Sequence, residues 1–313
     1  MAVDRLRIGV LDVESGQIHG TWIQEQVQEK HPDLKVVIRA LGAKPRHKRA
    51  AKSGHTVPIR AFYSEPIYEA LIASKVDVGV HRMKDLPSTL PEGVALEAVC
   101  ERKTPLDVLV TTDGSIIDEL PRGAHVGVSS LRRQAQLARY RPDLELVFVV
   151  GTLSERLHMV DSGKLQGIVV AASGIEWRGW QERVSEVFTA QVCTPAVGQA
   201  ALGLLVREGN EEIGELVRFL NHTLSQREVA AERSFHHSVG AWEGAPIGAL
   251  ARVKGDILKI EGCVCSLDGQ VVLRDRAEGF PDDPIRTGER LAKSLLEQGA
   301  AAILEEQGVE IVE

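Results

Sequence analysis

The sequence predicts an α/β protein in which two α/β domains precede a small α+β domain, and three observations carry this prediction. Short apolar runs alternate with amphipathic segments over the first two thirds of the chain, a pattern typical of sheets flanked by helices. Near residue 221 the pattern changes to a helix, three strands joined by turn signals and a final helix. The length of 313 residues also exceeds what one hydrophobic core usually supports.

Hydrophobic periodicity places the elements in order. Residues 7–10 predict a strand, and a helix over residues 17–30 is predicted by an apolar stripe of Ile18, Trp22, Ile23 and Val27. The same reasoning predicts strands over residues 34–40, 76–80, 125–128, 144–150, 167–171, 247–253, 258–266 and 271–276, and helices over residues 65–74, 131–140, 225–236 and 284–305.

Composition excludes several classes of function. The net charge of −7 argues against a general nucleic-acid binder, which needs clustered Lys and Arg. No apolar segment approaches the length that spans a membrane, and no targeting segment is recognisable at Met1. We therefore expect a cytoplasmic protein without a nucleic-acid or membrane partner.

The four cysteines predict neither a disulfide nor a metal site. They show no CxxC spacing, and Cys263 and Cys265 lie two apart in a predicted strand, so both face the same side. His236 and His237 with Glu243 invite a metal interpretation, but adjacent helical residues point about 100° apart. We expect reduced cysteines and no metal.

Residues 42–55 are rich in Lys and Arg and poor in apolar residues. The pattern favours a mobile, solvated loop. A basic lid that closes on an anionic ligand is the alternative.

An anion site is predicted where the strand at 125–128 meets the helix at 131–140. The helix N-terminus offers free N–H groups, Ser129 or Ser130 can cap it, and guanidinium groups follow at Arg132 and Arg133. The alternative is an ordinary cap with surface arginines.

The next helix adds a further cation to this prediction. Thr152 and Glu155 have the spacing of a capping box. Arg156 lies in the first turn, where the helix dipole favours an acidic residue, so we expect it to face an anion.

Lys84 and Asp85 follow a predicted buried strand and precede a proline. A carboxylate at the end of a strand could transfer protons or stabilise a cation. A simple ion pair is the alternative.

Several segments resemble the hydroxymethylbilane synthase (porphobilinogen deaminase) family in the family's own order, over about residues 5 to 305. HRMKDLP resembles the family's HSMKDVP or HSMKDLP, and GVSSLRRQAQL with RPDL resembles GTSSLRRxxQL with RPDL. GTLSERLHMVDSGK resembles RGNVxTRLxKLDxG, VCTPAVGQAALGL resembles LPAVGQGALGI, and AAERSFHHSVGAWEGAPIGA resembles AERAFxxxLxGGCxxPIGA.

The resemblance implies two type II periplasmic-binding-protein-like α/β domains, with residues 1–100 and 200–219 in one and 105–195 in the other. A small α+β domain is implied at 223–313. The family joins four porphobilinogen molecules and releases ammonia, with the product attached to a dipyrromethane cofactor that is thioether-linked to a cysteine.

The resemblance also implies roles for particular residues. The family's proton-transferring Asp and its neighbouring Lys fall on Asp85 and Lys84. The residues that hold carboxylate groups fall on Ser129, Ser130, Arg132, Arg133 and Arg156.

This chain departs from the family pattern at specific positions. Glu243 stands where the cofactor-bearing Cys belongs, so no covalently attached cofactor is predicted. Arg60 replaces a Lys but remains a candidate ligand residue. Further replacements fall on Leu11, Val13, Val150, Trp177 and Ala200.

These features lead to a first interpretation and two alternatives. The first is a divergent, monomeric paralogue related to tetrapyrrole (haem) biosynthesis that binds a pyrrole or other small anionic ligand, without dipyrromethane-dependent tetrapolymerisation. The alternative is an active deaminase or related transferase whose primer is non-covalent or linked to Glu243. A scaffold protein with a partner surface at residues 177–180 is the third possibility.

Overall fold

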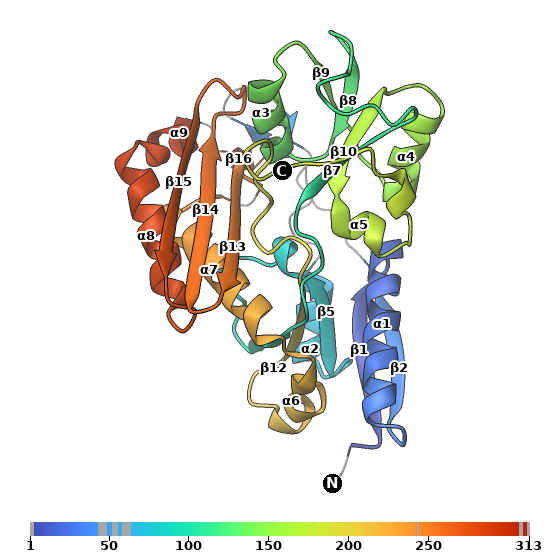
Figure 1. The fold of residues 1–313 in the computed structure, drawn as a ribbon. Coiled ribbons are helices and arrows are strands. Elements are labelled where there is room, and N and C mark those ends of the chain that lie inside the picture. Colours follow the sequence, from blue (N-terminus) through green and yellow to red (C-terminus); the bar gives the residue numbers. More distant parts are fainter. Residues whose placement is uncertain are drawn as a thin grey trace. The chain divides into compact units, whose positions relative to one another are not determined.

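The computed structural model describes residues 3–42, 49–51, 56–57, 64–242, 244–306 and 309–311 (Figure 1). The chain divides into two compact units. Unit 1 contains Met1–Arg46, Arg60–Arg102 and Ala201–Gln226, and unit 2 contains His47–Ile59, Lys103–Ala200 and Arg227–Glu313.

Unit 1 is built on a five-stranded sheet in the order β2-β1-β5-β12-β6. β1 pairs in parallel with β2 and β5, whereas β12 runs antiparallel to both β5 and β6. The strands are β1 (Arg5–Leu11), β2 (Lys35–Leu41), β5 (Val78–Arg82), β6 (Val94–Val99) and β12 (Leu202–Arg207).

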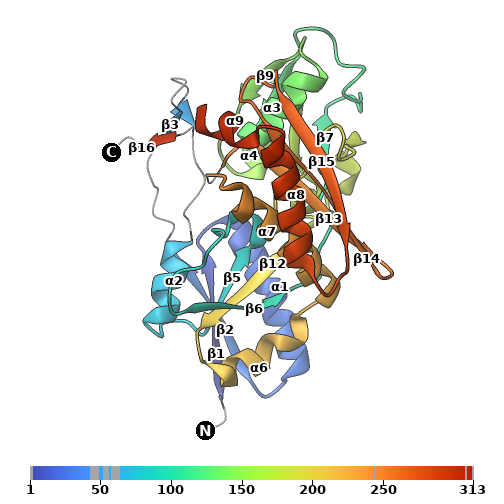
Figure 2. The same cartoon turned by 90° about the vertical axis from the view of Figure 1, so that its left-hand side faces the viewer.

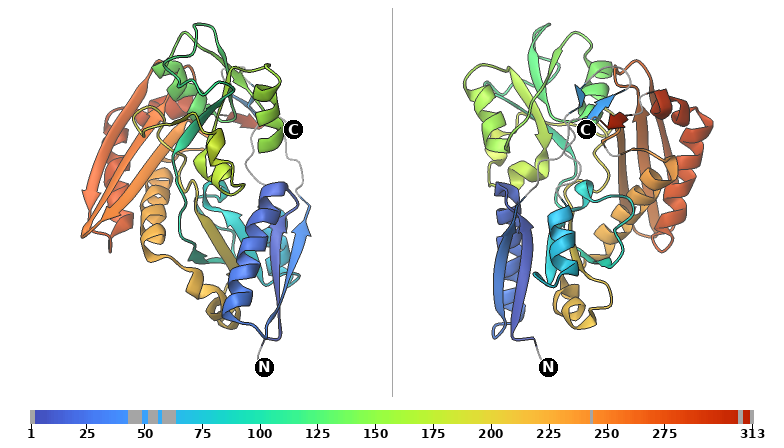
Figure 3. Two further views of the ribbon diagram at one scale, coloured as in Figure 1. Left: turned by 45° about the vertical axis from the view of Figure 1, so that its right-hand side comes forward. Right: turned by 180° about the vertical axis from the view of Figure 1, so that it is seen from behind.

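In its described residues, unit 1 contains the α-helices α1 (Glu14–Lys30), α2 (Glu65–Ile72) and α6 (Glu211–Val217). Figure 3 shows α1 running alongside β1 and β2. This packing is close, because a Cβ atom at Gly20 would lie 2.6 Å from the Val10 side chain. The apolar stripe of α1 buries Ile23 and Val27 against the sheet, as its periodicity predicts.

Unit 2 contains a second five-stranded sheet, in the order β11-β7-β10-β8-β9. β10, β8 and β9 run parallel, and β7 is antiparallel to β10 and β11. The strands are β7 (Asp107–Thr111), β8 (His125–Val128), β9 (Glu145–Phe148), β10 (Gly167–Ala171) and β11 (Glu186–Val187).

Both faces of this sheet are buried. Alternate residues of β7 enter two separate clusters, since Val108 and Val110 pack with α4 (Leu153–Asp161) and α5 (Ala172–Glu176), whereas Leu109 packs with α3 (Leu131–Tyr140). The C-terminal end of β8, where the chain continues into α3, therefore lies between the two covered faces of the sheet.

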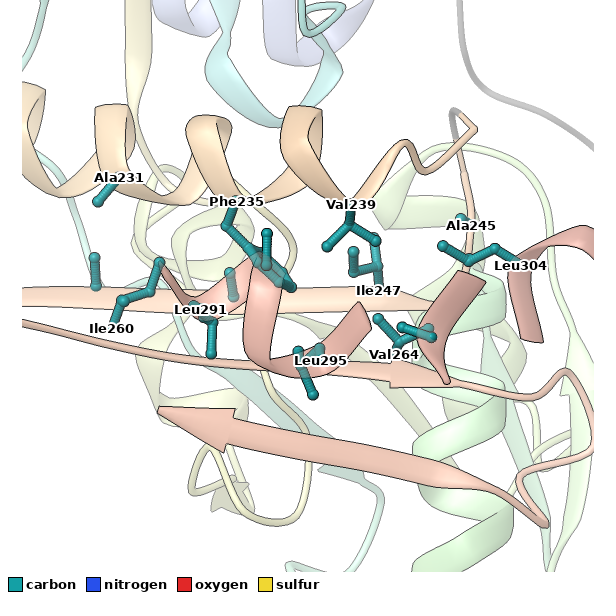
Figure 4. Close-up of a cluster of buried hydrophobic side chains, with 14 of the residues drawn as sticks. Ala231, Phe235, Val239, Ala245, Ile247, Ile260, Val264, Leu291, Leu295 and Leu304 are labelled. Carbon is teal, nitrogen blue, oxygen red and sulfur yellow. The ribbon is translucent and has the colours of Figure 1, made fainter. Parts of the chain in front are cut away.

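The C-terminal part of unit 2 is a three-stranded antiparallel sheet of β13 (Ile247–Lys254), β14 (Ile257–Cys265) and β15 (Val272–Gly279). Figure 2 shows α8 (Pro284–Glu297) lying along this sheet. Side chains from α7 (Thr223–Val239), α8 and α9 (Ala300–Glu306) form one apolar core with the strands (Figure 4).

The fold class predicted from the sequence is confirmed, because two mixed α/β sheets and a small antiparallel sheet with helices are present. The single helix expected over residues 284–305 is wrong. Gly299 adopts a positive φ of 101° and ends the first helix, so α8 and α9 are separate.

The basic segment at 42–55 is only partly described. β3 (Arg49–Ala51) pairs with β4 (Thr56–Val57) and with β16 (Val309–Ile311), so the loop prediction is wrong at residues 49–51. Residues 43–48 and 52–55 lie outside the described residues, and the lid interpretation stays a prediction.

Among the described residues, no helix is both long and apolar enough to cross a membrane.

Candidate functional site

A fully buried carboxylate organises the predicted anion site in unit 2. Asp107, the first residue of β7, is 0% exposed. Its Oδ2 lies 2.7 Å from Arg132 Nη2, and its Oδ1 lies 2.7 Å from Arg133 Nη2. Burial alone would raise the pKa of Asp107, but the two guanidinium groups outweigh it and hold this pKa well below its usual range.

Arg132 is enclosed by the chain. Its side chain is 4% exposed, and Nη1 donates to the Thr194 carbonyl oxygen at 2.6 Å and to Cys193 Sγ at 3.3 Å. The guanidinium therefore links α3 to the segment before Pro195. Contact between Arg132 and a ligand remains a prediction, and this geometry assigns it a structural role.

Arg133 and Arg156 converge on Ser129, and we call these three residues the Ser129 cluster. Arg133 Nη1 donates to Ser129 Oγ at 3.1 Å, and Arg156 Nη1 donates to the same oxygen at 3.0 Å. Ser129 follows β8 and is half-buried, and Arg156 comes from α4. The structure thus brings together three residues that the sequence analysis selected.

Two helix caps fix the cluster's position. Ser130 Oγ accepts a hydrogen bond from the Arg133 N–H at 3.3 Å and so caps α3. Thr152 and Glu155 form the predicted capping box at the start of α4, and the hydrogen bonds from Thr152 lower the pKa of Glu155. Because its hydroxyl caps the helix, Ser130 positions Arg133, and its contact with a ligand stays a prediction.

Gln199 belongs to the same network, and the sequence analysis missed this role. Its Nε2 donates to Asp107 Oδ1 at 2.9 Å and to the Pro105 carbonyl oxygen at 2.6 Å. The side chain is fully buried. A buried polar residue in the apolar VGQAALGL segment was the available signal, since such a group needs partners.

Lys84 and Asp85 lie in unit 1, on a 3-10 turn (Met83–Asp85) that follows β5. Met83 is buried beneath the turn, and Lys84 and Asp85 are half-buried. Asp85 Oδ2 lies 2.5 Å from Arg82 Nε. Asp85 therefore pairs with Arg82, which the sequence analysis did not select. An ion pair between Lys84 and Asp85, the alternative given there, stays a prediction.

Two other predicted positions, Arg60 and Glu243, lie outside the described residues. Their proposed roles stay predictions.

The positions where this chain departs from the resembled family differ in exposure. Val150 is 63% exposed, whereas Leu11 is buried. Trp177 is half-buried, and Lys103 Nζ lies 4.5 Å from its ring centroid, a cation–π contact. Trp177 thus packs against a cation of its own unit.

His236 is one of the potential metal ligands named in the sequence analysis. Burial, with smaller effects of Arg233 and His237, lowers the pKa of His236 to about 4. Within the described ranges, no group of three or more His, Cys, Asp or Glu side chains is placed to hold a metal ion.

The described residues do not fit a thioether-linked dipyrromethane. Such a bond needs an accessible thiol, and all four cysteines of the chain, each of which the structure describes, are buried. The Ser129 cluster, by contrast, offers the hydroxyl and guanidinium donors that bind carboxylates.

Comparisons with known proteins match almost the whole chain. The family model "Porphobilinogen deaminase, dipyromethane cofactor binding domain" matches residues 7–215, and "Porphobilinogen deaminase, C-terminal domain" matches residues 226–297. The chain is 36% identical to the porphobilinogen deaminase of Desulforamulus reducens over 305 residues, which cover 96% of this chain and 97% of that protein. It is 39% identical to that of Pelotomaculum thermopropionicum over 286 residues, 90% of each chain.

Solved structures give a weaker likeness. The substrate-binding domain of a putative molybdenum ABC transporter from Clostridium difficile aligns with a TM-score of 0.45 and 14% identity, over 73% of this chain and 96% of that one. The periplasmic VFT2 domain of Bordetella pertussis BvgS aligns with a TM-score of 0.43 and 16% identity, over 74% of this chain and 93% of that one. The family models and the sequence relatives together show that the chain belongs to the porphobilinogen deaminase family.

Proposed function

We propose that this protein binds a carboxylate-bearing pyrrole of the porphobilinogen type and acts on it as a transferase of tetrapyrrole biosynthesis, with a primer that is not linked to a cysteine. The observation that carries the proposal is the Ser129 cluster. Two guanidinium groups share one serine oxygen beside the N-terminus of α3.

The cluster is suited to a carboxylate ligand. Arg133 and Arg156 are 5% and 7% exposed, so their charges are little screened by water. A carboxylate that displaces the Ser129 contacts would receive charge-assisted hydrogen bonds, each contributing about 1.5–3 kcal/mol. Two hydrogen bonds to Asp107 hold the Arg133 side chain in place. Arg133 therefore loses less conformational entropy when a ligand binds.

Asp85 supplies the second part of the proposed chemistry. A carboxylate at this turn can stabilise a pyrrole that becomes cationic as its amine leaves, and it can accept the proton released when a new carbon–carbon bond forms. Met83 anchors the turn in the core of unit 1, which holds this carboxylate in place.

The relatives favour catalysis over simple binding. Chains 36–39% identical over at least 90% of their length are named porphobilinogen deaminase. The buried cysteines, together with Glu243 in the cofactor position, support a second candidate, a pyrrole-binding paralogue without tetrapolymerisation.

Turnover separates these two candidates. Purified protein would be incubated with porphobilinogen, and pyrrole consumption and ammonia release would be followed together. A working transferase consumes the pyrrole and releases ammonia, and Asp85→Asn abolishes both. If neither occurs although calorimetry shows that porphobilinogen binds, the result supports the second candidate, a pyrrole-binding paralogue without tetrapolymerisation. Absence of binding and of turnover would overturn both candidates.

The intact mass of the denatured protein tests the primer. A mass equal to that of the bare chain, with no colour from Ehrlich's reagent, is expected. A dipyrromethane-sized increment would contradict the proposed primer and show covalent attachment without the cysteine.

A further inference from the structure

Arg82 and Asp85 form an ion pair at the surface of unit 1. Arg82 is the last residue of β5, and Asp85 ends the 3-10 turn that follows it. Arg82 Nε lies 2.5 Å from Asp85 Oδ2, and the two side chains are 33% and 23% exposed. Asp85 Oδ2 is itself buried, so a ligand can reach only the remaining, exposed part of the two side chains.

A buried histidine holds the backbone at Arg82, and a buried serine holds the histidine. His81 Nδ1 donates to the Arg82 carbonyl oxygen at 3.0 Å, because a carbonyl can only accept. Ser64 Oγ lies 2.8 Å from His81 Nε2 and 3.4 Å from the Asp85 carbonyl oxygen. Burial lowers the pKa of His81, so the ring is neutral near pH 7 and its Nε2 accepts from Ser64. The backbone of Arg82, one member of the ion pair, is thus held in place.

Arg82 changes the charge of the turn. Arg82 and Lys84 are cationic and Asp85 is anionic, so the three side chains sum to one positive charge. A serine at position 82, as in the related HSMKD motif, would leave Lys84 and Asp85 with a sum of zero. A carboxylate that is already paired attracts an ammonium group less, and the surplus positive charge attracts a carboxylate.

We infer that Arg82 determines ligand preference at Asp85, disfavouring a pyrrole that carries a protonated amine and favouring one that carries only carboxylates. The inference rests on the proposed function and refines it. Porphobilinogen carries both an aminomethyl group and two carboxylates. Arg82 therefore lowers the affinity of the protein for porphobilinogen, the pyrrole that carries the amine.

The experiment compares two ligands that differ only at the amine. Isothermal titration calorimetry would measure porphobilinogen and its analogue with methyl in place of aminomethyl. The wild type is expected to bind the methyl analogue about tenfold more tightly, as for a partly screened charge pair. Arg82→Ser is expected to bring the ratio close to one, and Arg82→Lys to preserve it. The ratio cancels a general loss of folded protein.

A second readout reports on the ion pair without a ligand. Carbon-13 NMR of the Asp85 carboxyl group, assigned with Asp85→Asn, should titrate at higher pH in Arg82→Ser than in the wild type. An unchanged titration would overturn the inference, as would a ligand ratio that Arg82→Ser leaves unaltered. If neither pyrrole binds the wild type, the proposed function itself fails, which is a separate and recognisable outcome.

Discussion

Asp107 receives two hydrogen bonds from the Arg133 guanidinium, from Nη2 at 2.7 Å and from Nε at 3.1 Å, both on Oδ1. The other carboxylate oxygen binds Arg132. One buried carboxylate therefore neutralises only one of two buried guanidinium groups. The surplus positive charge lies beside Ser129, and we propose that it attracts an anion there.

Replacing this carboxylate tests how strongly the network supports unit 2. Asp107→Asn leaves two buried guanidinium groups without an anionic partner, so we expect the free energy of unfolding to fall by about 3–5 kcal/mol. Urea denaturation followed by circular dichroism measures the loss.

The matched control is Asp161→Asn. Asp161 pairs with Arg183 at 2.5 Å, but the two side chains are 47% and 33% exposed. A surface pair of this kind contributes about 1 kcal/mol or less. Equal losses in the two variants would show that burial of Asp107 does not matter to stability.

The stability of the protein should depend on pH through the same carboxylate. The pKa of Asp107 is lowered in the folded state relative to the unfolded value of about 3.9. Its contribution is therefore fully present above about pH 5 and decreases as the pH falls toward the folded pKa. Between about pH 5 and pH 3, the free energy of unfolding should fall more steeply for the wild type than for Asp107→Asn. Parallel profiles would exclude Asp107 as the source.

The cysteines should resist modification in the folded protein. Cys100, Cys193, Cys263 and Cys265 are at most 1% exposed, and burial raises the pKa of Cys100 and that of Cys193 to about 12 each. A hydrogen bond from Cys265 lowers the pKa of Cys263, but burial keeps reagents away from this thiol. Ellman's reagent should find no fast-reacting thiol near neutral pH and four thiols in guanidinium chloride. A rapid native reaction would reveal an accessible cysteine and reopen the possibility of a thioether.

The Ser129 cluster should control affinity more than stability. Arg156→Gln removes a cation that donates to Ser129 and is expected to weaken pyrrole binding about tenfold or more, the loss of one charge-assisted hydrogen bond. Calorimetry measures the affinity. Arg183→Gln, which removes a surface arginine of the same unit, should leave it unchanged. Equal effects of the two variants would mean that only overall charge matters.

Local sequence patterns predicted much of the fold but not its long-range pairings. The strands and helices with clear periodicity, such as α1 and α3, appear within a few residues of their expected bounds. β12 was missed because it inserts between β5 and β6, which precede it by more than a hundred residues. Strand pairing of this kind leaves no local signal.

The same distinction explains the outcome at the candidate site. Helix caps and the Ser129 position follow from local spacing, and Ser130 and Thr152 were found in this way. Asp107 binds Arg133 across 26 residues and Gln199 across 92, so their roles depend on the assembled sheet. The burial of Arg132 could not be predicted from the sequence either, because two consecutive arginines, Arg132 and Arg133, suggested an exposed surface.

Ala200 carries a backbone conformation that glycine adopts more easily. Its φ is 72°, in the left-handed region, and the related family motif has glycine there. Ala200→Gly removes the clash between Cβ and backbone but makes the unfolded chain more flexible. We expect a net gain of about 0.5–1 kcal/mol in the free energy of unfolding, because the relief of about 1–2 kcal/mol exceeds the entropic loss.

Ala201→Gly is the control for this change. Ala201 is 1% exposed, and its φ lies outside the positive region. The same substitution there removes a buried methyl group and adds flexibility, so a loss of about 1 kcal/mol or more is expected. Opposite signs for neighbouring alanines, measured by urea denaturation, would identify backbone strain at position 200. Destabilisation in both variants would show that the Ala200 methyl group contributes packing that outweighs its strain.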